Sequence, residues 1–283
     1  MNCKTCKIRI PAGDTSLKLL ILMPENGRED TGGGQQRTGI LWIHGGGYIT
    51  GMAGMVHMSR AKNLVRRYGA VVVSPEYRLA GTAPYPAALY DCHYALAYLR
   101  DHAGELGVRS DQIMVGGESA GGGLAAALCM YEKDTAGVNI AYQMPLYPML
   151  DCEDTETSRD NHAPVWNTKR NHYGWKKYLR GIGGGQVPCY ASAARRKAWD
   201  GLPPMYSFVS TAEPFYAETV TYAENLKKSG VEAQVDIYPG LFHAFDMLCP
   251  FLKVSRQAAA RFEEHFAYAQ KHYFAENPRG ECE

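Results

Sequence analysis

Apolar residues follow two spacings along this chain, and each spacing predicts a different kind of element. Short unbroken apolar runs predict buried strands, whereas a period of about 3.6 residues predicts helices. The predicted strands are 7–10, 17–23, 39–43, 70–77, 112–116, 141–146, 205–210 and 233–238. The predicted helices are 58–68, 86–100, 121–131 and 217–229. Because strands and helices alternate from residue 39 onward, the pattern predicts an α/β fold whose mostly parallel sheet is covered on both faces.

Turn residues and charges mark the segments between these elements. Pro11, Gly13 and Asp14 separate the first two strands, which are therefore predicted to form a hairpin. Residues 25–36, which include three consecutive glycines, are predicted as a loop. Residues 152–200 interrupt the alternation with charge clusters and three tryptophans. So long a segment inside a compact domain is usually functional or disordered, and the density of aromatic residues favours a folded piece. We therefore expect one domain over residues 1–283, with an inserted, partly helical cap or lid at 152–200.

The composition favours a globular fold with a small, weakly charged partner. Hydrophobic residues make up 46% of the 283 positions and charged residues only 21%, which excludes a disordered chain. Thirty Lys and Arg against 29 Asp and Glu leave a net charge of +1, so no strong field attracts nucleic acid or anionic membranes. No apolar run reaches the roughly 18 residues of a membrane span, and no signal peptide precedes the first strand. We expect a cytoplasmic protein, and the sequence leaves open whether it forms a homodimer.

The cysteines do not indicate a metal or a disulfide framework. The eight residues are scattered, which is typical of reduced thiols in a chain without a signal peptide. Cys3 and Cys6 form a C-x-x-C pair, but a four-ligand zinc site needs a second pair, which no nearby Cys or His supplies. We therefore expect no metal there.

The strongest chemical signal is the G-x-S-x-G pattern of residues 117–121, between a predicted strand and a predicted helix. A nucleophile on such a sharp turn needs small neighbours, and the helix N-terminus favours the negative charge that develops during acyl transfer. We predict that Ser119 is the nucleophile. The alternative interpretation is a glycine-rich, phosphate-binding turn at the start of a helix.

A second glycine-rich segment, HGGGY at 44–48, follows a buried strand in the position that suits an oxyanion loop. Glycines allow backbone N–H groups to converge on one point, where they stabilise an oxyanion by several kcal/mol. We assign Gly46, Gly47 and Ala120 as the donors. His44 is expected to hold the loop by hydrogen bonds rather than to act as the base.

A serine hydroxyl needs a base, and the base needs a carboxylate to orient it. His243 follows the last predicted strand within GLFHAF, a strand-end setting that the other histidines except His44 lack. Glu213 follows the end of the strand at 205–210 and is our candidate for the acid. Glu218, on the following helix, and Asp246, close in sequence to His243, are the competing carboxylates.

These motifs together resemble the hormone-sensitive-lipase-like branch of the α/β-hydrolase esterases. The resemblance covers residues 38 to about 250 and rests on HGGGY, GESAGGG, YRLA at 77–80, PYPAALYD at 84–91, LPPMY at 202–206 and GLFHAF. It implies a serine carboxylesterase with an eight-stranded, mostly parallel sheet, a cap over the pocket and no cofactor. Ser119, Glu213 and His243 take its triad positions, and Gly46, Gly47 and Ala120 its oxyanion hole.

Three features depart from the family pattern. The family usually has Asp-Pro-Leu where this chain has Glu213, Pro214 and Phe215, and its YRLAPE is here YRLAGT. The oxyanion motif already begins at residue 44, so the family's N-terminal helical cap is absent and 152–200 supplies most of the lid. We expect a pocket of different shape, with Trp166, Trp175 and Tyr178 either lining it or packing the lid onto the body.

The expected reaction is hydrolysis of short-chain acyl esters through an acyl-enzyme intermediate. His243 deprotonates Ser119, and then passes the proton to the leaving alcohol. Two alternatives remain at this stage: an amidase of the arylformamidase type with the same triad, and a ligand receptor on this fold that does not catalyse.

Overall fold

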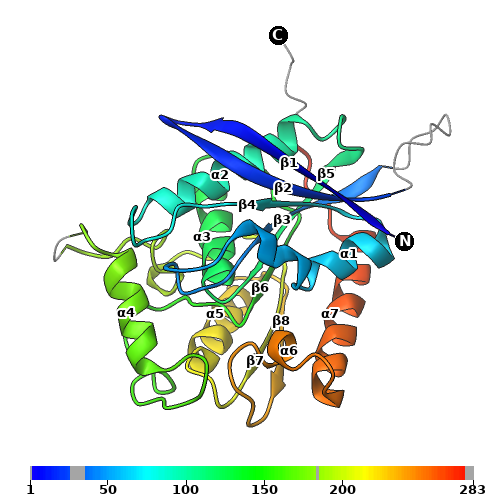
Figure 1. Cartoon of the computed structure of the whole chain (residues 1–283). Helices are drawn as coiled ribbons and strands as arrows, with labels where there is room; N and C mark the ends of the chain where they lie inside the picture. Colours follow the sequence, from blue (N-terminus) through cyan, green and yellow to red (C-terminus); the bar gives the residue numbers. More distant parts are fainter. Residues whose placement is uncertain (1, 26–35, 183–184, 278–283) are drawn as a thin grey trace.

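Eight strands form one mixed sheet in the part of the chain that the structure describes. The computed structural model describes residues 2–25, 36–182 and 185–277. The strands are β1 (Cys3–Ala12), β2 (Thr15–Pro24), β3 (Arg37–Ile43), β4 (Val71–Pro75), β5 (Val108–Glu118), β6 (Tyr142–Leu146), β7 (Met205–Ser210) and β8 (Ala233–Tyr238). Their order is β1-β2-β4-β3-β5-β6-β7-β8; the β1–β2 and β2–β4 pairs are antiparallel and the other pairs are parallel (Figure 1). The predicted α/β fold with a mostly parallel, eight-stranded sheet is confirmed.

The central strands bury both of their faces, which explains their unbroken apolar runs. In β3, Ile40 and Trp42 belong to the core on one side of the sheet, whereas Leu41 and Ile43 belong to the core on the other side. All four side chains are fully buried. The alternation of side-chain direction along a strand therefore supplies both cores from one sequence segment.

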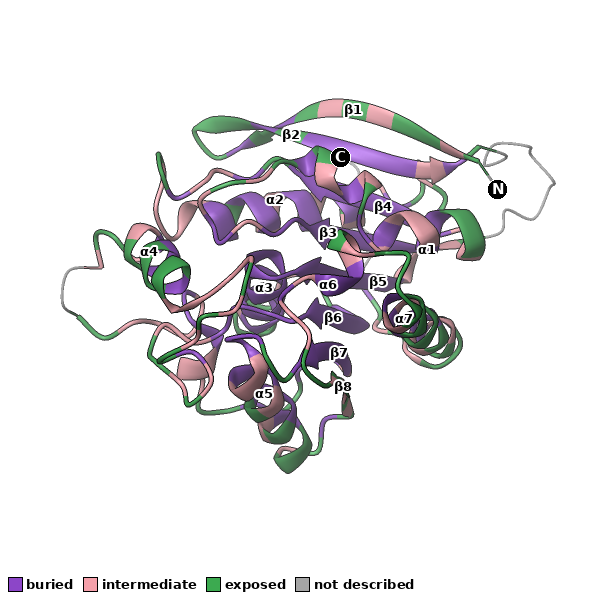
Figure 2. Cartoon of the chain, turned by 60° about the horizontal axis from the view of Figure 1, so that its bottom comes forward, coloured by how far each residue is buried: buried purple, intermediate pink, exposed green. Residues whose placement is uncertain are grey.

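Helices cover the two faces. On one side lie α2 (Ala87–Asp101), α3 (Ala120–Asp134) and α5 (Tyr216–Lys228), whose apolar residues share a core with Leu41 and Ile43. On the other side lie α1 (Ala61–Tyr68) and α7 (Lys253–His272), which share a core with Ile40 and Trp42. Figure 2 shows α1, α2, α5 and α7 with both buried and exposed residues, whereas α3 is buried over almost its whole length.

Several elements differ from the sequence prediction. The strand β1 begins at Cys3 rather than at residue 7, β5 begins at Val108 rather than at residue 112, and the short helix α6 (Phe245–Leu248) was not predicted. The helix predicted at 58–68 begins only at Ala61, because Ser59 accepts a hydrogen bond from the Ala61 N–H and a 3-10 helix, η1 (Ala53–His57), precedes it. The long helix α7 was not predicted. Its buried face combines Ser255, Ala258 and Glu263 with Phe262 and Phe266, so small and polar residues dilute the apolar periodicity.

Residues 152–200 contain α4 (Thr168–Tyr178) and a short 3-10 helix, η2 (Ala193–Arg195), between irregular stretches. The loop predicted at 25–36 lies almost wholly outside the described residues, as do Gly183, Gly184 and Cys282. Across the described ranges, no helix has both the length and the apolar character that crossing a bilayer requires.

The parallel strands β3, β5, β7 and β8 all end at the same edge of the sheet, where ligands of open α/β sheets usually bind. Each predicted site residue follows one of these ends. The loop containing His44 follows β3, Ser119 follows β5, Glu213 follows β7 and His243 follows β8.

Candidate active site

Ser119 occupies a strained turn between β5 and α3. Its φ of 57° and ψ of −122° are unusual for a residue with a side chain. The turn is held because the Ser119 N–H donates to Leu146 O at 3.0 Å and the Ser119 carbonyl accepts from Met149 N at 3.0 Å. Glycine is required beside it, since a Cβ on Gly117 would lie 2.5 Å from the Ile43 carbonyl oxygen. The glycines of the motif thus serve close backbone packing, as the pattern predicted.

His243 meets the serine from the loop after β8. Its Nε2 lies 2.9 Å from Ser119 Oγ, and the histidine is only 3% exposed. Two aromatic rings fix the imidazole: Tyr147 lies 5.1 Å and Phe215 5.0 Å from it, both edge to face. Rotation of the imidazole away from Ser119 would therefore require repacking of this cluster.

Glu213 completes the contact sequence from the end of β7. Its Oε2 pairs with His243 Nδ1, while its Oε1 accepts a hydrogen bond from the Ser210 N–H at 2.9 Å. The carboxylate is fully buried. These contacts assign the proton of the neutral imidazole to Nδ1, which leaves Nε2 free to accept the serine proton.

The two competing carboxylates are engaged elsewhere. Glu218 Oε1 accepts from the Leu150 N–H at 2.7 Å, and burial raises the pKa of Glu218 well above its usual range. Asp246 forms an ion pair with Arg60 at 2.8 Å. Among the three carboxylates considered, Glu213 alone has a hydrogen bond to His243.

The HGGGY loop lies directly against Ser119. A Cβ on Gly45 would be 2.9 Å from the Glu118 carbonyl oxygen and 3.2 Å from Ser119 Cβ. Gly46 and Gly47 have φ values of 119° and 59°, which turn this backbone in a way that favours glycine. Among the hydrogen bonds of the described residues, the N–H groups of Gly46 and Gly47 have no acceptor. Ala120 is the first residue of α3, so its N–H has no acceptor within the helix.

His44 supports this loop and stands apart from the Ser119, His243 and Glu213 contacts. It is 2% exposed, its ring stacks on Tyr77 at 4.1 Å, and the Tyr77 hydroxyl donates to the His44 carbonyl at 3.0 Å. Burial lowers the pKa of His44, which keeps the ring neutral. Its Nδ1 lies 2.8 Å from the Gly45 carbonyl oxygen.

The three aromatic residues expected in the cap have different positions. Trp166 lies 6.4 Å from the His243 ring and so close to Gly47 that a Cβ there would collide with the indole. Trp175 and Tyr178 instead pack on the buried Tyr48, at 5.4 and 4.0 Å. Trp166 therefore lines the site, whereas the other two fasten α4 to the body of the protein.

Tyr147 and Phe215 were not identified as site residues from the sequence. Tyr147 comes directly after β6, so its place at a parallel strand end was an available signal. In the sequence, Phe215 was notable only because the family usually has leucine at this position. Its contact with His243 depends on the convergence of two loops, which local sequence does not encode.

Glu118 is a buried carboxyl that directly precedes Ser119. Its Oε2 accepts a hydrogen bond from Trp42 Nε1 at 2.8 Å, and its Oε1 has no partner among the described residues. Burial raises the pKa of Glu118 to about 8, against the opposing effect of the Trp42 hydrogen bond. Glu118 is therefore largely protonated at neutral pH.

This pKa predicts a pH-dependent effect of the Glu118→Gln substitution on stability. The folded-state pKa is raised, so wild-type stability falls as the pH rises from the ordinary value of 4.5 to about 8. Glutamine keeps an acceptor for Trp42 and never ionises. We expect the free energy of unfolding of the variant to match wild type near pH 4.5 and to exceed it by about 1–4 kcal/mol near pH 8.5. Urea unfolding at both pH values measures this difference. An equal difference between variant and wild type at pH 4.5 and pH 8.5 would contradict the raised pKa of Glu118.

No metal site emerges at this edge or at Cys3 and Cys6. Within residues 2–25, 36–182 and 185–277, no three Cys, His, Asp or Glu side chains are grouped so as to hold an ion. The cysteines of these ranges are free thiols.

Comparison with known proteins identifies relatives with the same architecture. A family profile described as alpha/beta hydrolase fold matches residues 40–247. Esterase LipI of Mycobacterium tuberculosis is 29% identical over 208 residues, which cover 73% of this chain and 65% of LipI. Carboxylesterase NlhH of the same organism is 28% identical over 78% of this chain and 70% of its own length. The solved structure of a bacterial heroin esterase aligns with a TM-score of 0.83 and 32% identity, covering 92% of this chain and 82% of the other.

Proposed function

The chain belongs to the α/β-hydrolase fold family, and from this membership we propose that it is a serine carboxylesterase that hydrolyses short-chain acyl esters. The observation that carries the proposal is the unbroken series of contacts from Ser119 Oγ through the His243 ring to the Glu213 carboxylate. Relatives named as esterases and carboxylesterases support ester substrates.

The first half of the reaction acylates Ser119. His243 Nε2 takes the hydroxyl proton as Ser119 Oγ attacks the ester carbonyl carbon, and Glu213 stabilises the resulting imidazolium through Nδ1. The N–H groups of Gly46, Gly47 and Ala120 stabilise the carbonyl oxygen as it becomes negative. His243 then gives its proton to the leaving alkoxide, the ester C–O bond breaks, and the alcohol departs.

The second half releases the acid. His243 Nε2 takes a proton from water, whose oxygen attacks the acyl carbon under the same oxyanion donors. When the tetrahedral intermediate collapses, the bond to Ser119 Oγ breaks and His243 returns the proton to the serine. The enzyme is regenerated without a cofactor.

A panel of p-nitrophenyl esters with acyl chains from acetyl to octanoyl, together with an aryl formamide, tests this proposal. We expect kcat/KM to be highest for the short esters and at least tenfold lower for the formamide. Faster turnover of the formamide would favour the amidase alternative, and absence of turnover on every substrate would contradict the proposed function.

The short-chain preference follows from the enclosure of the nucleophile. Ser119 is only 7% exposed, and Trp166 and Phe215 both approach the His243 ring. We infer that Trp166 limits the room for the acyl chain. The cap role of residues 152–200 is part of the same proposal, since α4 and Trp166 come from this segment.

Replacing Trp166 with leucine is expected to shift chain-length preference. The smaller side chain leaves space beside His243, so the ratio of kcat/KM for the octanoyl ester to that for the acetyl ester should rise about 10- to 200-fold, the range for one methylene of pocket space. Trp175→Leu is the matched control, because Trp175 packs on Tyr48. An equal shift of the ratio in Trp175→Leu would contradict a specific role of Trp166 in the pocket.

We also propose the setting in which this enzyme acts: the cytoplasm, on small esters, without nucleic acid or membrane insertion. The near-zero net charge and the free thiols of the described residues support this setting. Size-exclusion chromatography would show whether the chain forms a homodimer.

A further inference from the structure

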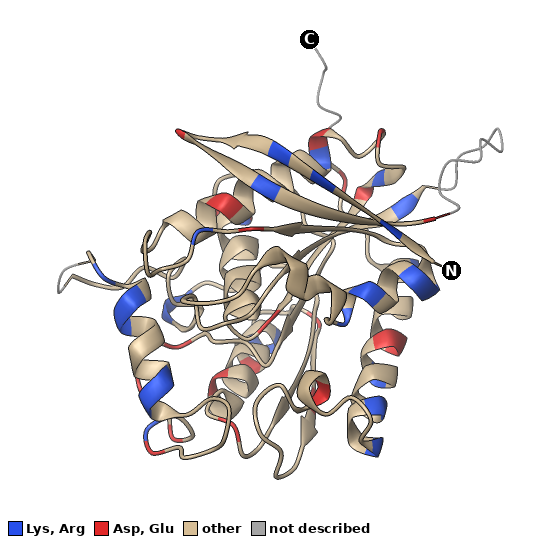
Figure 3. Ribbon diagram, in the orientation of Figure 1, with Lys and Arg blue, Asp and Glu red and all other residues tan. Residues whose placement is uncertain are grey.

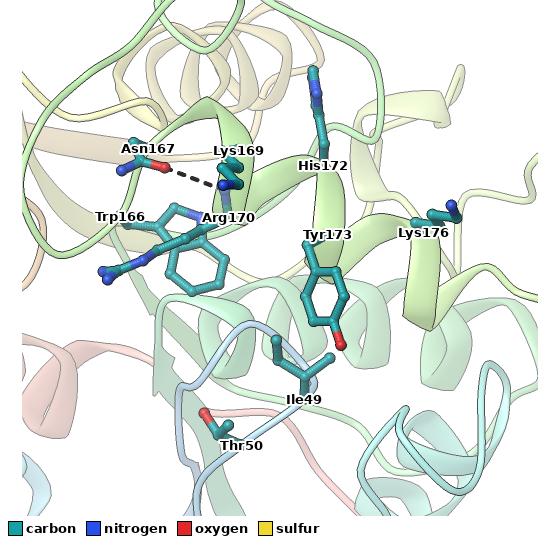
Figure 4. A pocket seen from close by; sticks show the side chains of 9 residues that line it. All are labelled: Ile49, Thr50, Trp166, Asn167, Lys169, Arg170, His172, Tyr173 and Lys176. Carbon is teal, nitrogen blue, oxygen red and sulfur yellow. Dashed lines mark hydrogen bonds between the residues drawn. The ribbon is translucent and has the colours of Figure 1, made fainter.

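A surface groove opens beside the oxyanion loop. It has a volume of about 750 Å³, within the usual range for small-molecule sites. Ile49 and Thr50, which directly follow the HGGGY loop, form one wall, and Trp166 and Tyr173 contribute aromatic surface from the other. In Figure 4 the Tyr173 side chain points from α4 toward Ile49.

The groove adjoins the reacting centre through two contacts. Trp166 lines the groove and also lies 6.4 Å from the His243 ring. Gly174 brings α4 against the oxyanion loop, because a Cβ on Gly174 would be 3.0 Å from the Gly47 carbonyl oxygen. The helix α4, which forms the outer wall, therefore packs directly against the loop that contains the proposed oxyanion donors.

The groove is rich in positive charge. Lys169, Arg170 and Lys176 line it, and α4 contains no Asp or Glu (Figure 3). Among the described residues, no carboxylate lies within ion-pair distance of these three cations. The overall net charge of +1 therefore conceals a local excess of positive charge beside the site.

Three carboxylates that precede α4 in the chain are paired with other residues. Asp151 and Glu153 both bind Arg195 at 2.7 Å, and Asp154 lies 2.7 Å from His172, which also lines the groove. Among the described residues only Lys133 and Lys228 of the lysines have a carboxylate partner, so what matters is position: Lys169, Arg170 and Lys176 border one groove beside the oxyanion loop.

We infer that this groove binds a carboxylate carried by the substrate, so that the enzyme prefers esters whose end remote from the reacting carbonyl is anionic. This inference rests on the proposed function and names a substrate class for the same site. The apolar wall contacts the connecting chain, while Lys169, Arg170 and Lys176 attract the charge. Because these cations are exposed, each contributes modestly: about 1.4- to 5-fold in kcat/KM, and less at high salt.

Two pairs of esters separate charge from size. Mono-p-nitrophenyl adipate and p-nitrophenyl hexanoate have six-carbon acyl chains and differ in a terminal carboxylate. The pair 4-acetoxybenzoate and methyl 4-acetoxybenzoate compares a carboxylate with its neutral methyl ester on the alcohol side of the acetyl ester. For at least one pair we expect the anionic ester to have the higher kcat/KM in 20 mM NaCl, with the advantage reduced several-fold in 500 mM NaCl.

The double variant Lys169→Gln/Lys176→Gln locates the effect. It should lower kcat/KM for the preferred anionic ester by about 3- to 20-fold and change that for its neutral partner by less than about 2-fold. Lys227→Gln/Lys228→Gln is the matched control, because it removes two charges from the end of α5, outside the groove. We expect this control to leave the anionic-to-neutral ratio unchanged.

Three results would overturn the inference. They are the absence of an anionic preference in both pairs, an equal loss on both esters in the groove variant, and an equal shift of the ratio in the α5 control. Turnover of the neutral esters distinguishes these failures from failure of the proposed function, since an enzyme that hydrolyses them without charge preference is still a carboxylesterase. If no ester of either pair is hydrolysed, the proposed function itself fails.

Discussion

Replacing either Ser119 or His243 with alanine is expected to lower kcat for a short p-nitrophenyl ester by about 10⁴- to 10⁶-fold. Without Ser119 no covalent intermediate forms, and without His243 the serine hydroxyl keeps its proton and remains a poor nucleophile. The 2.9 Å contact between Ser119 Oγ and His243 Nε2 is the geometric basis for treating the two as one unit. Steady-state kinetics on the purified variants measures the loss.

The double variant provides the control for this prediction. Because the two residues act in the same proton transfer, removing both should cost no more than about 10-fold beyond the worse single variant. Multiplicative losses would show that they act independently and would contradict the proposed proton path. Unfolding curves that overlay wild type would exclude misfolding as the cause.

The second large effect is expected for Glu213→Gln, which should lower kcat by about 10³- to 10⁴-fold. Wild-type Glu213 accepts hydrogen bonds through both oxygens, one from Ser210 N–H and one from His243 Nδ1. Glutamine has one acceptor and one donor group. Turned one way, its NH₂ faces the Ser210 N–H; turned the other way, it donates to Nδ1 and places the imidazole proton on Nε2, where it blocks the serine.

Glu218→Gln is the matched control for the acid. Glu218 is equally buried but binds the Leu150 N–H, away from the imidazole. We expect its kcat to stay within about 10-fold of wild type, a loss smaller than removal of a triad member causes. Wild-type turnover in Glu213→Gln, or the larger loss in Glu218→Gln, would show that the acid is misassigned.

The architecture was predictable because its signals are local. Buried parallel strands leave unbroken apolar runs, and β7 and β8 have the residue limits that the sequence predicted. The turn at Ser119 was recognisable because close backbone packing admits only glycine at 117 and 121. Glu213 and His243 could be chosen as candidates because each follows a strand end, even though Glu213 stands where the family pattern has Asp.

The remaining features depend on tertiary contacts. The helix α7 escaped prediction because its buried face includes Ser255 and Glu263, and Glu263 is held by Arg67 and Asn63 from α1. Tyr147 and Phe215 meet the His243 ring only after three strand ends converge. The division of roles between Trp166 and Trp175 likewise depends on which side of α4 faces the oxyanion loop.

Labelling with a fluorophosphonate, followed by peptide mapping, tests the central claim most directly. The probe reacts with a serine hydroxyl only when a neighbouring base has activated it. We predict one label per chain, on Ser119, with a rate at least 100-fold slower in His243→Ala. A chain that hydrolyses esters while Ser119 stays unlabelled, or that carries the label on another residue, would contradict the account.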